Sequence, residues 1–228
     1  MMGVRDDLPG QLAAGVQALG LPLTDAALQQ LLDYLALLQR WNQVINLTAV
    51  RAPAQMVTHH LLDSLAVVAP LRRQLLAHGL GGGAAPRILD VGSGGGLPGV
   101  VLAVAEPGWQ VTCVDAVAKK AAFITQVAAT LGLPNLRAVH ARVQQLDGPY
   151  DVVCARALAT LAELVGWTGH LLAPGGLWLA LKGRTPQEEI AALPPWVEVF
   201  HVEPVTVPGL AAERCLVWLR RRADAKTP

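Results

Sequence analysis

The sequence has few cysteines, and their positions argue against a metal site. Only 3 of the 228 residues are cysteines (Cys113, Cys154 and Cys215), widely spaced and with no histidine cluster beside them. Structural zinc sites and disulfide frameworks use paired, closely spaced ligands, which this chain lacks. Each cysteine stands in an apolar, strand-like stretch, so we interpret all three as small buried hydrophobic residues and expect no bound metal.

Charged residues are also scarce, at 15% of the chain, and the formal net charge is only +1. With 53% apolar residues, this composition excludes a chain that is mainly disordered. The small net charge argues against a protein that grips a long nucleic acid with its whole surface. Any contact with a nucleic acid must therefore come from local basic residues.

Long hydrophobic runs are absent. A membrane-spanning helix needs roughly 20 apolar residues, and acidic residues interrupt every candidate stretch. Residues 1–7 include two acidic residues and lead into no apolar segment of the kind found in secretory signals. We therefore expect a soluble, cytoplasmic protein that has no contact with a membrane. We also expect it to be a monomer.

Residues 1–78 have the periodicity of helices. From Leu28 to Trp41 the apolar residues recur at intervals of three and four, and Thr24 stands where a helix N-cap is expected. A second helix is predicted over residues 53–65. The glycine-rich segment 79–86 cannot continue a helix, so it is predicted to join a helical appendage, residues 1–78, to the rest of the chain.

Residues 87–220 form the predicted core, in which short apolar runs alternate with helical stretches. This alternation is typical of a parallel sheet with right-handed crossovers, and the last two runs read as an antiparallel pair at one edge. The predicted fold class is α/β, a doubly wound and mostly parallel Rossmann-like sheet. The predicted strands are 87–91, 110–115, 136–140, 150–156, 176–182, 196–204 and 214–220, the predicted helices are 98–105, 119–131 and 161–172, and residues 221–228 are a flexible tail.

A glycine-rich turn follows the first predicted strand. Gly92, Gly94 and Gly96 have no Cβ atoms to keep a ligand from the backbone, and the helix that follows directs free N–H groups towards it. This is the sheet edge at which open α/β folds bind nucleotides. Leu97 stands where a dinucleotide fingerprint requires glycine, and no P-loop lysine follows, so both of those motifs fail.

Asp115 lies 23 residues after Gly92, at the end of the second predicted strand. A carboxylate at this point can accept hydrogen bonds from both hydroxyls of a ribose. The glycine turn and this acid together predict an adenosine-containing ligand, with more specificity than the turn has alone.

The glycine turn is one of several stretches that match a known family. The matching stretches are Trp41-Asn42, Ile45–Arg51, His60–Leu65, Asp90–Gly99, Val114–Ala116, Lys119-Lys120, Ala155–Ala157 and Leu181–Gly183. The D-x-G-x-G-x-G turn resembles that of class I methyltransferases dependent on S-adenosyl-L-methionine. Over nearly its whole length the chain resembles the RsmG/GidB family of bacterial 16S rRNA guanine-N7 methyltransferases.

This resemblance implies a set of cofactor-binding residues. Residues along the methionine and sulfonium would come from the glycine turn, those at the ribose from the end of the second strand, and those at the adenine from the segment after the third. Many relatives are acidic at the position of Gln144, which leaves both a side-chain and a backbone contact to adenine open. The implied residues are Gly92, Gly94, Gly96 and Leu97 (methionine), Asp115 and Ala116 (ribose), Val143 and Gln144 (adenine), and Arg156, which would close the pocket.

The resemblance also implies the substrate, a guanine of the position 527 type in the 530 loop of 16S rRNA, within a small ribosomal subunit or its precursor. Guanine N7 has a lone pair and no proton, so methyl transfer needs placement rather than a general base. The sequence accordingly shows no persuasive catalytic dyad. The basic candidates for the substrate face are Arg51, His59, His60, Lys119, Lys120, Arg142, Arg156, Lys182 and Arg184.

Several polar residues and several functions remain open from the sequence. Asn46, Thr48, Asp63 and Ser64 could line the pocket or serve only as caps and packing contacts. A methyltransferase of the same fold acting on a small molecule, and a non-catalytic module that senses the cofactor, remain alternatives. A nicotinamide-dependent oxidoreductase is disfavoured by the missing glycine.

Overall fold

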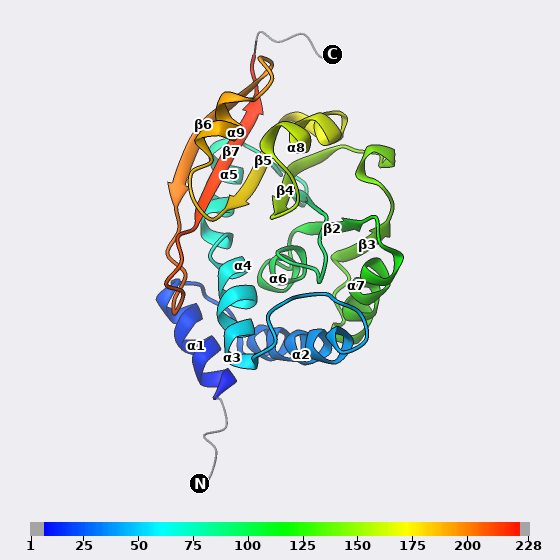
Figure 1. The fold of residues 1–228 in the computed structure, drawn as a ribbon, viewed down its shortest axis with the longest axis vertical. Coiled ribbons are helices and arrows are strands. Elements are labelled where there is room, and N and C mark those ends of the chain that lie inside the picture. Colours follow the sequence, from blue (N-terminus) through cyan, green and yellow to red (C-terminus); the bar gives the residue numbers. More distant parts are fainter. Residues whose placement is uncertain (1–6, 224–228) are drawn as a thin grey trace.

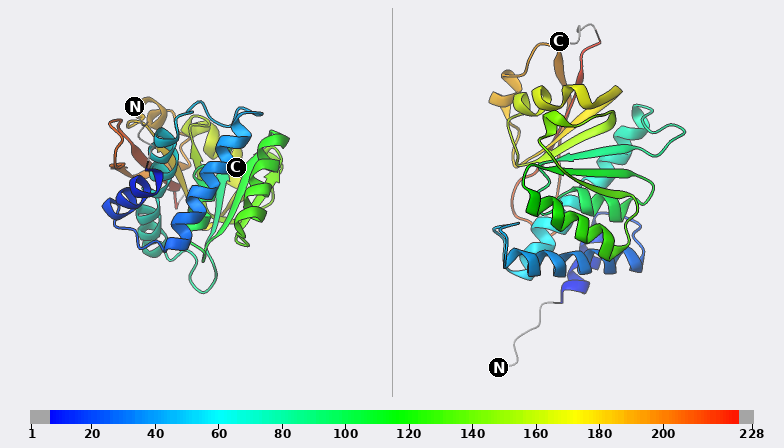
Figure 2. Two further views of the ribbon diagram at one scale, coloured as in Figure 1. Left: turned by 90° about the horizontal axis from the view of Figure 1, so that it is seen from below. Right: turned by 90° about the vertical axis from the view of Figure 1, so that its right-hand side faces the viewer.

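The computed structural model describes residues 7–223, which contain a seven-stranded mixed sheet with helices on both faces (Figures 1 and 2). The strand order is β3-β2-β1-β4-β5-β7-β6. The first five strands are parallel, and β7 runs antiparallel to both β5 and β6. The predicted α/β class is confirmed. The strands are β1 Arg87–Val91, β2 Gln110–Asp115, β3 Leu136–His140, β4 Tyr150–Arg156, β5 Leu172–Lys182, β6 Val197–Pro204 and β7 Cys215–Arg221.

The helices form two groups that cover opposite faces of the sheet. The N-terminal helices share one hydrophobic cluster with α6 and α7, and α8 belongs to a second cluster on the other face (Figure 1). The helices are α1 Leu8–Ala18, α2 Asp25–Asn42, α3 Pro53–Met56, the π-helix η1 Val57–Leu62, α4 Asp63–Leu65, α5 Val68–Ala77, α6 Gly99–Ala105, α7 Ala118–Leu131, the 3₁₀ helix η2 Val143–Gln145, α8 Leu161–Thr168, the 3₁₀ helix η3 Gly169–Leu171 and α9 Gln187–Ala191.

Helix α2 begins and packs as its sequence predicts. The Thr24 side chain accepts a hydrogen bond from the backbone N–H of Ala27, which caps the helix. The apolar side of α2 faces α7, where the ring centroid of Trp41 lies 5.5 Å from that of Phe123. The N-terminal helices are thereby fixed to the sheet layer.

Helix α6 is enclosed on all sides, since each of its seven residues is buried. A helix that is apolar all round needs neighbours on every face. The sheet covers one side of α6, and the N-terminal helices α2 and α4 cover another. Residues 7–77 therefore form a second layer over this face of the sheet, while the division into appendage, join and core stays a prediction.

Most predicted element boundaries are confirmed, and the exceptions have local causes. Strands β1 to β4 match their predicted bounds. Strand β5 begins at Leu172 rather than at residue 176, because Leu172 already pairs with Tyr150 of β4. Gly175, with φ +75°, lies in the irregular part of β5 where its register against β4 shifts. Helix α8 ends at Thr168 and continues as η3, and the helix predicted over residues 53–65 contains η1.

The C-terminal strands differ by one residue from their predicted bounds: β6 starts one residue later and ends at Pro204 as predicted, and β7 is shifted by one residue at both ends. Strand β6 begins at Val197, and β7 runs from Cys215 to Arg221. Arg221 pairs with Val197 and is therefore part of the sheet rather than of the predicted tail. Residues 224–228 lie outside the described part of the chain.

Across residues 7–223, no helix has the length and apolar composition required to cross a membrane.

Candidate functional site

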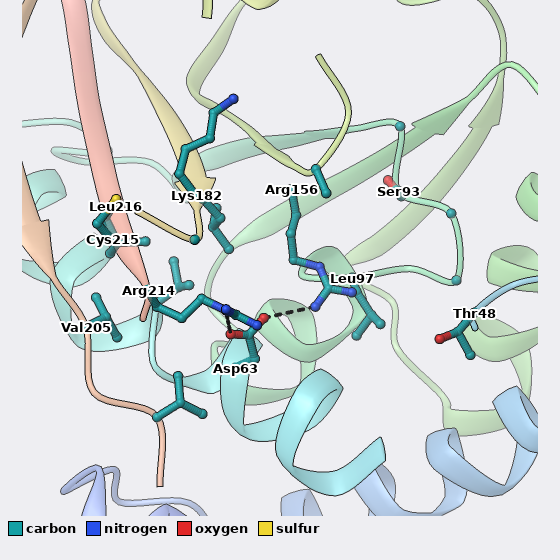
Figure 3. Close-up of a pocket in the computed structure, with 18 of the residues that line it drawn as sticks. Thr48, Asp63, Ser93, Leu97, Arg156, Lys182, Val205, Arg214, Cys215 and Leu216 are labelled. Atoms are coloured by element: carbon teal, nitrogen blue, oxygen red, sulfur yellow. Dashed lines mark hydrogen bonds and ion pairs between the residues drawn. The ribbon is translucent and has the colours of Figure 1, made fainter. Parts of the chain in front are cut away.

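The glycine turn follows β1, at the point between β1 and β4 where the strand order reverses. Two of the cavities at this edge of the sheet border the glycine turn. The first, of about 410 Å³, lies between the glycine turn, β5 and β7 (Figure 3). The second, of about 560 Å³, lies towards β2 and η2. Gly92 and Ala157 line both cavities, so the ends of β1 and β4 separate two adjoining chambers.

The backbone of the glycine turn adopts conformations that favour glycine. Gly92, Gly94 and Gly96 have φ values of +65°, +57° and +89°, which side chains rarely adopt. A Cβ atom added at Gly94 would meet no atom closer than 3.9 Å, the carbonyl oxygen of Gly92. The backbone at Gly94 therefore borders free space in the first cavity.

Asp115 fixes this turn to the end of β2. Its Oδ2 accepts a hydrogen bond from the Gly94 N–H at 3.0 Å, and its Oδ1 accepts one from the Val117 N–H at 2.8 Å. The carboxylate is largely buried and lines the second cavity. A carboxylate has about four acceptor sites, so both oxygens can accept further hydrogen bonds.

The residues predicted to surround a ribose and an adenine come together in the second cavity. Ala116, Val143 and Gln144 line it beside Asp115. Sequence reasoning did not single out Leu158 and Trp167, which supply apolar surface to the same cavity. Leu158 follows Ala157, whose φ of +52° turns the chain sharply after β4, and no local sequence signal marks this turn.

Arg156 lines the first cavity and forms an ion pair inside it. Its Nη1 lies 3.0 Å from Asp63 Oδ2 and also donates to the His59 carbonyl at 3.1 Å. Arg214, which the sequence analysis missed, reaches the other oxygen of Asp63, with Nε 2.7 Å from Oδ1 (Figure 3). Strand β7 runs antiparallel to β5, so it starts beside Lys182, where β5 ends. The predicted strand start at residue 214 therefore indicated that Arg214 lies at the same edge of the sheet.

The other predicted basic contacts differ in how they are engaged. The Lys182 ammonium lies 2.8 Å from Glu189 Oε2 and 3.1 Å from the Ala159 carbonyl, and it points away from Asp63 (Figure 3). Arg184 is exposed in the loop after β5. Three other predicted basic residues are also exposed, at other places in the chain: Arg51, Arg142 and, in helix α7, Lys119. Lys120 is half-buried at the second cavity. These predicted substrate contacts stay predictions.

His60 does not occupy the surface position that its predicted role requires. The side chain is 5% exposed, lines neither of the two cavities, and has its Nε2 atom 2.8 Å from Thr48 Oγ1. Burial, assisted by the nearby Arg156 charge, lowers the pKa of His60 to about 4. A neutral, buried imidazole is not a basic contact for RNA, and Thr48 instead lines the first cavity.

The low pKa of His60 predicts a pH-dependent stability. The unfolded imidazole titrates near pH 6.5, so between about pH 6.5 and 4 protons favour the unfolded chain. The His60 imidazole does not lower the free energy of unfolding above pH 6.5, and it lowers this free energy by up to about 3 kcal/mol at pH 4. His60→Gln, which can retain the bond to Thr48, should lose less unfolding free energy than wild type between pH 7 and 5 in urea titrations. Parallel pH profiles would contradict this assignment.

Two further buried groups lie at the site. Tyr34 was not singled out from the sequence, and Asp90 entered only as the acidic residue of the D-x-G-x-G-x-G turn, without a role of its own. The Tyr34 hydroxyl donates to the Gly95 carbonyl at 2.5 Å, linking α2 to the glycine turn. Asp90 is fully buried, and its Oδ2 accepts a hydrogen bond from the Gly99 N–H at 3.0 Å. Its Oδ1 has no hydrogen-bond partner among residues 7–223, and burial raises the pKa of this carboxyl to about 6.

Solved structures similar to this one include a putative methyltransferase, at low sequence identity. A putative methyltransferase, yhhF from Escherichia coli, superposes with a TM-score of 0.51 at 16% identity, covering 69% of this chain and 87% of that one. TrmN from Thermus thermophilus gives a TM-score of 0.50 at 21% identity, covering 73% of this chain and 53% of that one. At these identities the likeness concerns the fold alone.

Comparison of sequences identifies the family more specifically than comparison of folds. A relative from Paracidovorax citrulli (strain AAC00-1), named ribosomal RNA small subunit methyltransferase G, is 60% identical over 99% of this chain and 95% of its own. One of the same name from Acidovorax ebreus (strain TPSY) is 62% identical over 92% and 93%. The GidB family model, described as rRNA small subunit methyltransferase G, matches residues 27–217. The resemblance carried by the motifs is confirmed, and the chain belongs to the GidB family of methyltransferases.

Proposed function

We propose that this protein transfers a methyl group from S-adenosyl-L-methionine to N7 of a guanine in 16S rRNA, of the position 527 type in the 530 loop. The observation that supports the proposal best is the pair of adjoining cavities at the switch point of the sheet. One has a buried carboxylate suited to a ribose, and the other has two arginines suited to a polyanionic substrate.

The residues present fit S-adenosyl-L-methionine. The second cavity combines Asp115, an acceptor for ribose hydroxyls, with the apolar side chains of Leu158 and Val143, between which an adenine can pack. Gly94 leaves space along the adjoining turn, where a Cβ would project into the site. The bound cofactor would supply an electrophilic methyl group on a sulfonium.

The chain itself would act by orientation. The polar side chains that line the first cavity include one carboxylate, Asp63, and it is already paired with two guanidinium groups. It is therefore poorly suited to remove a proton from a substrate. Guanine N7 requires no such base, because its lone pair can attack directly once it is in line with the methyl group. The side chains that line the first cavity thus favour a methyl acceptor that has no proton to lose.

RNA contacts would come from the rim of the same cavity. Arg156 and Arg214 are each about a quarter exposed and keep donor groups beyond those that bind Asp63. Arg184 lies exposed in the loop after β5. Guanidinium groups at one edge of a sheet can bind phosphates locally, as the small net charge of the chain requires.

The decisive test is methyl transfer from labelled S-adenosyl-L-methionine to small ribosomal subunits from cells that lack this protein, and to their naked 16S rRNA. We expect one labelled 7-methylguanosine per RNA after nucleoside digestion, located in the 530 loop. A label on another base or atom would refute the guanine-N7 assignment. Cofactor binding without transfer to either RNA would refute the function and favour a small-molecule methyltransferase or a sensing module.

A further inference from the structure

Asp63 lies between the two arginines of the first cavity. It is the first residue of α4 and is 6% exposed. One carboxylate oxygen binds Arg156, at the end of β4, and the other binds Arg214, directly before β7. Figure 3 shows the two guanidinium groups approaching Asp63 from opposite sides. A single buried carboxylate therefore links three segments that are far apart in the sequence.

The backbone before Asp63 supports the same arrangement. The π-helix η1, Val57–Leu62, immediately precedes it, and π-turns occur frequently at functional sites. The carbonyl of His59 within η1 accepts a second hydrogen bond from Arg156 Nη1 at 3.1 Å. Arg156 is thus held by one carboxylate and one carbonyl, which together fix the plane of its guanidinium group.

The charges explain why the arginines need this partner. Two guanidinium groups that line one cavity repel each other, and a carboxylate between them offsets that repulsion. Each arginine uses only some of its five donors on Asp63 and on backbone carbonyls. The remaining donors and a net positive charge are left for an anionic oxygen in the cavity.

We propose that Asp63 is a positioning residue that holds Arg156 and Arg214 in the orientation needed to bind an anionic oxygen of a reactant. This rests on the proposed methyltransferase function. The oxygen belongs either to the carboxylate of the cofactor or to a phosphate of the RNA, since both present the same chemistry to a guanidinium group.

The test compares Asp63→Asn and Asp63→Glu with wild type. Asn keeps the shape of the side chain and removes the charge, so kcat/KM for methyl transfer should fall at least 30-fold. Glu restores a carboxylate and should recover part of that loss. Calorimetry with S-adenosylhomocysteine and filter binding with 16S rRNA fragments distinguish the two sources of the oxygen. Weaker cofactor binding identifies the carboxylate, and weaker RNA binding identifies the phosphate.

Asp151→Asn is the matched control. Asp151, like Asp63, pairs with an arginine, here Arg87, whose backbone N–H it accepts as well, but it lies near the start of β4, at the opposite end of that strand from Arg156. The Asp151→Asn substitution should lower the melting temperature without raising the Kd for S-adenosylhomocysteine or for the 16S rRNA fragments. A similar loss of binding in Asp151→Asn would mean that the effect of Asp63 is only structural and would overturn the proposal.

A double-mutant cycle gives an independent readout. If Asp63 acts through Arg214, then Asp63→Asn should cost much less in an Arg214→Ala background than in wild type. Independent, multiplicative losses would overturn the positioning role. Both binding assays work without turnover, so they still test Asp63 if wild type methylates no RNA and the proposed function fails.

Discussion

Asp115→Ala should raise the Kd for S-adenosyl-L-methionine by about 30-fold. The substitution removes the proposed acceptor for the ribose hydroxyls, and a hydrogen bond to a charged group contributes about 1.5 to 3 kcal/mol. It also releases the N–H groups of Gly94 and Val117, which Asp115 now holds at 3.0 and 2.8 Å. The glycine turn would then sample other conformations, which adds to the loss of affinity.

Isothermal titration calorimetry on the purified protein measures this effect directly. Asp147→Ala, at an exposed aspartate in the loop before β4, is the control and should leave the Kd within about twofold of wild type. An unchanged Kd in Asp115→Ala would exclude the ribose-binding role. Circular dichroism of both variants would show whether the fold is retained.

The strands of the sheet could be predicted from sequence because each is a short apolar run with a clear start and stop. Strands β1 and β2, which support the site, are buried on both faces, and the pattern changes where they end, at Val91 directly before Gly92 and at Asp115. The parallel order then brings the glycine turn and Asp115 to the same edge. Local pattern and a general topological rule together were sufficient for this half of the site.

The other half depends on contacts between distant segments, which periodicity does not encode. Asp63 and Arg214 are separated by 151 positions, and Tyr34 and Gly95 by 61. Nothing local distinguishes Asp63 from a helix-capping residue, or His60 from an exposed basic residue on the same helix. Their roles become visible only when the N-terminal helices pack over the sheet and bury them.

Asp90→Asn should stabilise the protein near pH 7, the reverse of most substitutions at a buried polar residue. Burial raises the folded pKa of Asp90 from 3.8 to about 6, so the ionised carboxylate at pH 7 destabilises the fold by about 3 kcal/mol. Asparagine removes the charge and keeps an acceptor for the Gly99 N–H. Its buried NH₂ group costs about 1 kcal/mol, which leaves a net gain of about 2 kcal/mol.

The pH dependence of this gain separates charge from packing. As pH falls through 6, folded Asp90 takes up a proton before the unfolded carboxyl does, so wild type recovers the lost stability and the advantage of Asp90→Asn shrinks towards pH 4. Urea unfolding of both proteins at pH 7.5, 6 and 4.5 measures this difference. A stability difference that does not change with pH would mean that the pKa of Asp90 is the same in the folded and the unfolded protein.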